Sequence, residues 1–194
     1  MSQLFAEFTQ MSSIDFDLEK RSAVQTYEDY ILGGRQLVPC VGFYNFNKRI
    51  AWIRGHSYHS AEEHEMQLFQ MLMCSSSLRA VNVVATFAYP VLYSDNITRD
   101  SIVTIIANHL GSVAEPFSYS VEGEKVIFND DIEISENSLC YPQEINELLA
   151  TSMKISKSLD KPSRLLEWLS FLNFEIEFNE DYNIDNIDSA TFMP

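Results

Sequence analysis

The chain is short of basic residues. Its 194 residues include 13 Lys and Arg against 28 Asp and Glu, which gives a formal net charge of −15. The acids are not unusually dense, because charged residues make up 21% of the chain, slightly below the usual value of about 25%. Such a surface repels phosphate, so we expect neither direct nucleic-acid binding nor attachment to an anionic membrane. The charge favours a basic protein partner.

Cysteine is scarce as well. Cys40, Cys74 and Cys140 are an odd number at wide spacing, and no Cys-x-x-Cys pair occurs. This pattern argues against a disulfide framework and against a zinc ribbon. Cys40 and Cys74 stand in apolar runs, so we interpret them as small buried hydrophobic residues.

Targeting signals and long apolar runs are also missing. The chain begins Met-Ser-Gln-Leu, without the basic start and apolar stretch of a secretory signal. It contains no run of about 18 apolar residues, the length needed to span a membrane. Together with the cysteine pattern, these features predict a soluble cytoplasmic protein.

Glycine and proline are few, with six of each, whereas hydrophobic residues make up 46% of the chain and include 13 Phe and 9 Tyr. A disordered chain would show the opposite bias. The length fits one domain. We therefore predict a single domain over residues 1–194, in which residues 1–12 form a flexible arm and residues 179–194 form an acidic C-terminal tail.

The apolar spacing predicts an α+β fold. We expect a mixed, mainly antiparallel sheet of five to seven strands, with helices packed mainly on one face. The run at 81–92 is almost wholly apolar, which is typical of a strand in the middle of a sheet. Pro39 suggests that the first strand lies at a sheet edge. Helices are predicted over 13–32, 60–73, 142–153 and 163–172, and strands over 37–46, 50–54, 81–92, 101–108, 117–121, 126–128 and 174–178.

Two helix ends carry specific signals. Ser13 is the predicted N-cap of the first helix, and Gly33-Gly34 supplies its stop. Ser60 and Glu63 have the spacing of a capping box, in which each side chain bonds the backbone amide of the other residue. In the helix that follows, the predicted buried stripe consists of Leu68, Phe69, Leu72 and Met73.

Three histidines lie close together in the sequence at this helix start. If Ser60 is the N-cap, then His59 and His64 occupy the two positions whose side chains meet in a hydrophobic staple, and His56 comes from the preceding strand. Three imidazoles with Glu62 or Glu63 would suit zinc or another divalent metal. The same rings could instead pack as plain aromatic groups, with no cofactor, and this is the interpretation we prefer.

No recognisable catalytic set or phosphate-binding loop appears in the sequence. We therefore predict a non-catalytic protein-binding domain with a regulatory or inhibitory role and an acidic surface, of which an acidic mimic of nucleic acid is a special case. The alternative is a small metal-dependent hydrolase, in which a metal held by His56, His59 and His64 activates water and Glu62 or Glu63 acts as base.

Overall fold

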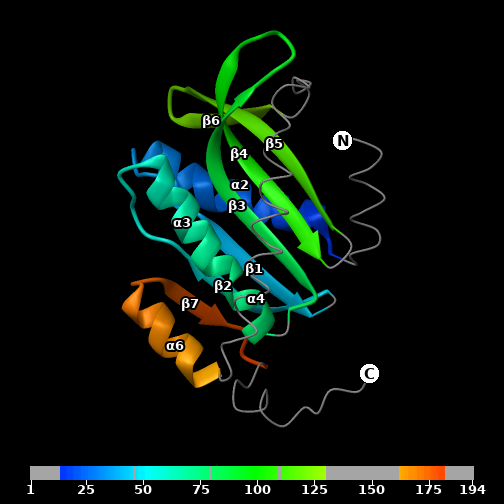
Figure 1. Cartoon of the computed structure of the whole chain (residues 1–194). Coiled ribbons are helices and arrows are strands. Elements are labelled where there is room, and N and C mark those ends of the chain that lie inside the picture. Colours follow the sequence, from blue (N-terminus) through cyan, green and yellow to red (C-terminus); the bar gives the residue numbers. More distant parts are fainter. Residues whose placement is uncertain (1–13, 46, 79, 109–110, 130–161, 182–194) are drawn as a thin grey trace.

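A computed structural model gives the structure of the protein and describes residues 14–45, 47–78, 80–108, 111–129 and 162–181. It confirms the α+β class and the antiparallel sheet (Figure 1), which has seven strands in the order β6-β5-β4-β3-β1-β2-β7. The strands are β1 (Cys40–Asn45), β2 (Lys48–Arg54), β3 (Asn82–Leu92), β4 (Thr98–Asn108), β5 (Gly111–Glu122), β6 (Lys125–Asn129) and β7 (Glu175–Phe178). The helices are α2 (Phe16–Leu32), α3 (Ala61–Leu72), α4 (Cys74–Ser77) and α6 (Pro162–Phe171).

The sheet is built from antiparallel neighbours, as the short polar turns predicted. β1 pairs with β2, and β5 pairs with β6 around Gly123, whose φ of 64° suits a residue without a side chain. β3 and β4 pair along their whole length, from Asn82 opposite Asn108 to Leu92 opposite Thr98. The apolar strand β3 is the fourth of seven, so its predicted central position is confirmed.

Three prolines are placed where the ladder can tolerate them. The prediction that Pro39 marks an edge strand is wrong, because β1 lies between β3 and β2. Pro39 precedes the strand, and its carbonyl accepts a hydrogen bond from the Gly55 amide at 2.8 Å. Pro90 and Pro116 lie inside strands, at positions paired only with β4. Because no second strand pairs at these positions, the missing proline N–H deprives no strand on that side of a hydrogen bond.

Helices cover both faces of the sheet, so the expectation that they pack mainly on one face is not confirmed. Alternate residues of a strand point to opposite faces. Figure 1 accordingly shows α2 and α3 on opposite sides of the sheet. One face carries a core that includes Phe43, Ile53, Val83, Ala85, Phe87, Val103 and Ile105, together with Leu68, Met71 and Leu72 of α3, Cys74 of α4 and Leu169 of α6. The other face packs Ile102 and Phe117 against Ala23 and Tyr27 of α2.

The ends of α2 follow simple capping rules. Its N-cap is Asp15, whose carboxylate accepts a hydrogen bond from the Leu18 amide at 3.0 Å. Asp15 therefore takes the role predicted for Ser13, which lies outside the described residues. Gly33 is the C-cap, and Gly34 has a φ of 61°, so the predicted glycine stop is confirmed.

β7 closes the sheet at the β2 edge. Its exposed glutamates, Glu175 and Glu177, discourage pairing with a second chain. Glu175 forms an ion pair with Arg54 of β2, at 3.3 Å. Past the strand, Asp181 forms an ion pair with Lys48 at 3.0 Å.

The predicted arm, the helix over 142–153, Cys140 and the tail beyond residue 181 lie outside the described residues. Within the residues that are described, no helix combines the length and the apolar character needed to cross a membrane.

Candidate functional site

The segment between β2 and α3 is held by a close approach at Gly55. A Cβ atom on Gly55 would lie 2.4 Å from Oε1 of Gln67, 2.8 Å from the Met71 side chain and 3.0 Å from Pro39, so any larger residue would displace the buried Gln67 and Met71 side chains. The same Gln67 oxygen accepts a hydrogen bond from the His56 amide at 3.0 Å. Gln67 is buried on α3, and this contact fixes where the chain leaves β2 and enters the helix.

The helix begins with the predicted capping box, with one change. Oγ of Ser60 accepts a hydrogen bond from the Glu63 amide at 3.1 Å. The Glu63 carboxylate accepts one from the amide of His59, at 2.6 Å, instead of the amide of Ser60. Glu63 therefore ties the loop one residue further back and has less freedom to serve as a metal ligand or a base.

His64 is buried against aromatic rings. It is 4% exposed, its ring centroid lies 4.7 Å from that of Tyr58 and 5.6 Å from that of Phe87, and its Nε2 has no hydrogen-bond partner among the residues that the structure describes. Burial lowers the pKa of the ring to about 4, so His64 is neutral at pH 7. The predicted staple contact between His59 and His64 is not formed, because Tyr58 packs beside His64 and His59 is exposed.

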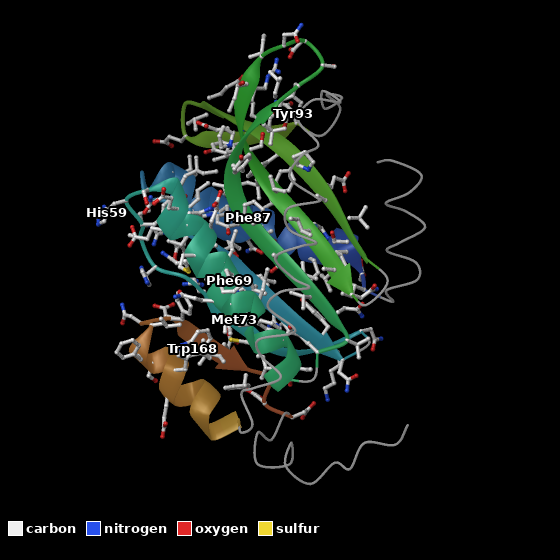
Figure 2. The ribbon with its side chains drawn as sticks, viewed as in Figure 1. His59, Phe69, Met73, Phe87, Tyr93 and Trp168 are labelled. Carbon is white, nitrogen blue, oxygen red and sulfur yellow. The ribbon has the colours of Figure 1, made fainter. Side chains whose placement is uncertain are left out.

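The other two histidines have different surroundings. The His56 ring lies 5.7 Å from that of Phe174 and contacts the Gln67 amide group. His59 is exposed, and Figure 2 shows it at the outer edge of the molecule, away from Phe87. In the part of the chain that the structure describes, no three His, Cys, Asp or Glu side chains are grouped so that they could hold a metal ion. The structure therefore does not bring the three predicted metal ligands together.

Cys40 and Cys74 are buried, as the sequence predicted. Burial raises the pKa of both thiols, so each stays protonated at neutral pH. Since the thiolate is the reactive form, neither cysteine is suited to act as a nucleophile.

One face of α3 points away from the sheet. We call it the α3 outer face and define it as Glu62, Glu65, Met66 and Phe69 together with Met73, the C-cap of the helix. These positions fall on one side of a helix with 3.6 residues per turn, opposite the buried His64, Gln67, Leu68, Met71 and Leu72. Met66 is 53% exposed, and Phe69 and Met73 are half-buried and follow one another along α3 in Figure 2.

The α3 outer face corrects the predicted buried stripe. Leu68 and Leu72 are buried as expected, but Phe69 and Met73 belong to none of the core clusters that the described residues form. Met71, Gln67 and His64 take the buried positions instead. The signal was present in the sequence, because Glu62, Met66, Phe69 and Met73 share one side of a helical wheel. The predicted stripe did not allow for a buried face that is partly polar.

The charge of this face is negative. α3 contains no Lys or Arg, and Glu62 and Glu65 are exposed. Neither forms an ion pair with any described residue. Several bases elsewhere have neighbours: Lys48, Arg54 and Arg99 are in ion pairs, Arg35 and Arg49 lie over the rings of Tyr30 and Trp52, and Arg35 also bonds the Asp29 carbonyl.

Comparisons of the chain with protein-family models, with curated proteins and with solved structures found no match. What the protein does must therefore follow from its own residues. Among the described residues, the α3 outer face combines an accessible apolar row with glutamates at its N-terminal end.

Proposed function

We propose that the protein is a non-catalytic protein-binding domain, with a regulatory or inhibitory role, whose α3 outer face receives a basic partner. The observation that carries the proposal is the row of Met66, Phe69 and Met73 beside Glu62 and Glu65, which form no ion pair with a described residue. Methionine side chains adapt to different partners because they are flexible and polarizable. The glutamates favour a partner of opposite charge.

The net charge of −15 supports the same choice of partner. An acidic surface speeds the encounter with a basic protein and slows the approach of nucleic acid or an anionic membrane.

The alternative of a metal-dependent hydrolase receives no geometric support. His64 is enclosed by Tyr58 and Phe87, His59 is exposed, and His56 contacts Phe174. A hydrolytic metal site needs three protein ligands converging on one point with a position open for water.

Charge reversal on α3 tests the proposal. We expect a partner that the wild-type protein retains from a lysate of its own cells to be lost, by at least about tenfold, from the double variant Glu62→Lys/Glu65→Lys. The matched control is Glu122→Lys/Glu124→Lys, which makes the same change in net charge at the exposed β5–β6 turn. Retention is measured by quantitative mass spectrometry of proteins held on the immobilised chain.

The two variants also distinguish a binding site on α3 from a general effect of net charge. Equal loss with both variants would mean that net charge acts without a site on α3, and equal retention would contradict the proposal. A lysine at position 62 lies at the positive end of the α3 dipole, and we expect it to lower the free energy of unfolding by about 0.3 to 1 kcal/mol. Circular dichroism and urea unfolding of both variants therefore accompany the measurement.

A further inference from the structure

We infer that the partner binds the α3 outer face through a single amphipathic helix that runs antiparallel to α3 and carries its basic residues near its C-terminus. This inference rests on the proposed function and adds the form and direction of the bound segment. The charge gradient along α3 and the spacing of Met66, Phe69 and Met73 carry it.

A helix suits this surface better than an extended segment. The backbone of α3 makes its hydrogen bonds within the helix, so it offers no N–H or C=O groups for a strand to pair with. An extended segment laid over Met66, Phe69 and Met73 would bury its own backbone groups without partners, which is costly. In a helical segment, the backbone N–H and C=O groups are hydrogen-bonded to one another within the helix.

The apolar row has the spacing that a second helix can cover. Met66, Phe69 and Met73 stand at positions i, i+3 and i+7 and extend about 10 Å along the axis, at 1.5 Å per residue. Two turns of an amphipathic helix, with apolar residues at i, i+3 or i+4, and i+7, present a matching ridge.

The position of the glutamates determines in which direction the bound helix runs relative to α3. Glu62, Glu63 and Glu65 lie in the first turns of α3, and no acid or base follows them in the helix. The bases of the partner must therefore lie beside the N-terminal turns of α3. Lys and Arg are favoured at a helix C-terminus, where the carbonyl groups carry partial negative charge, and antiparallel helix dipoles attract. Both conditions are met when the C-terminus of the partner lies beside the N-terminus of α3.

Synthetic helices test the direction directly. The probes are three 16-residue peptides with the same leucine row, each held helical by a lactam bridge on its solvent face. The first carries four lysines in its last two turns, the second carries them in its first two turns, and the third carries glutamates in place of the lysines. Binding to the full chain is measured by fluorescence anisotropy at low salt. We expect the first peptide to bind tightest, the second at least about fivefold more weakly, and the third not at all.

A substitution at Met66 tests whether the peptide binds to the α3 outer face. Met66→Ser should weaken the binding of the first peptide at least about fivefold. Val121→Ser, a change at a side chain of the same 53% exposure on β5, should leave it unchanged. Both substitutions are at exposed positions, so neither is expected to unfold the protein.

Three results would overturn the inference: tighter or equal binding of the second peptide, no effect of Met66→Ser, or equal binding of a proline-containing basic peptide that cannot form a helix. These results leave the proposed function standing if the cellular partner is still lost from Glu62→Lys/Glu65→Lys. Loss of the proposed function itself appears instead as retention of that partner by the charge-reversed variant.

Discussion

The imidazole ring of His64 is buried, and burial disfavours its charged form. Burial lowers its pKa to about 4, while the unfolded chain keeps a value near 6.5. Between these values the unfolded state binds more protons than the folded state, so the free energy of unfolding falls as the pH falls through this window. Below pH 4 the loss levels off, because both states are then protonated. From pH 7 to pH 5 we expect this one ring to cost about 2 kcal/mol of stability.

The measurement is urea unfolding of the wild type and of His64→Phe at pH 7 and at pH 5. Phenylalanine keeps an aromatic ring beside Tyr58 and Phe87 and removes the Nε2 atom, which bonds no described residue. The variant should lose about 2 kcal/mol less than the wild type over this change of pH, because the other titrating groups are common to both proteins. A His59→Phe control, at an exposed position, should behave as the wild type. Equal pH dependence of His64→Phe and wild type would show that His64 is not the group responsible.

The residue scale also shows why the histidine cluster could not be predicted in full. The capping box predicts which positions flank Ser60, but local sequence does not determine whether Tyr58 or His59 packs against His64. In the structure Gln36 decides this, because its side-chain amide bonds both the N–H and the carbonyl of Tyr58, at 2.9 Å each. This clamp comes from the loop between α2 and β1, 22 residues away in the chain. It holds Tyr58 against His64 and leaves His59 exposed.

At the scale of the element, α3 depends on the cap at its start. Ser60→Ala removes the acceptor of the Glu63 amide, and we expect it to lower the free energy of unfolding by about 1 kcal/mol. Because α3 supplies Leu68, Met71 and Leu72 to the core, the loss should appear in global unfolding as well as in fraying of the first turn. Urea unfolding gives the first quantity, and hydrogen exchange of the amides at 61–64 gives the second.

A serine nearby provides the control. Ser57 is exposed, and Ser57→Ala should change the free energy of unfolding by less than about 0.5 kcal/mol. If Ser60→Ala were as stable as Ser57→Ala, the cap would contribute nothing, and the Glu63 bond to the His59 amide would hold the helix start alone.

The strands were more predictable than the orientation of the helices. Alternation and apolar runs placed β3, β4 and β7 within a few residues of their observed bounds, because side chains in a strand have a period of two whatever lies above them. Helix faces are harder, since the buried side of α3 includes the polar His64 and Gln67. Each is accommodated by one tertiary arrangement, aromatic rings for His64 and the Gly55 backbone approach for Gln67. Neither arrangement is visible in local periodicity.

At the scale of the whole molecule, the sequence does not say which face of the sheet each helix covers. α2 reaches the second face because Tyr27 fits between Val38 and Thr86, where its hydroxyl lies 2.8 Å and 3.0 Å from their carbonyl oxygens. This contact joins residues 59 apart in the chain. Composition, by contrast, gives the net charge directly, and that charge has consequences for stability that need no structure.

The charge should give stability and binding opposite responses to salt. With a net charge of −15, like charges crowd when the chain folds, and this self-repulsion weakens the compact state. Raising NaCl from 0.01 to 0.15 M shortens the Debye length from about 30 to about 8 Å. We expect a gain of about 1 kcal/mol in the free energy of unfolding, which would raise the melting temperature by about 2 to 4 °C. The same screening should weaken the binding of a lysine-bearing peptide to α3.

A calorimetric melting series over that salt range measures the effect. The matched variant Glu62→Gln/Glu65→Gln/Glu122→Gln/Glu124→Gln, with four fewer exposed negative charges, should respond less to salt because it has less repulsion to screen. Ion pairs act in the opposite direction, since salt weakens the attraction between Lys48 and Asp181 and between Arg54 and Glu175. Exposed pairs of this kind contribute about 0 to 1 kcal/mol each. A melting temperature that stayed constant or fell with salt would mean that these attractions outweigh the repulsion among the remaining acids.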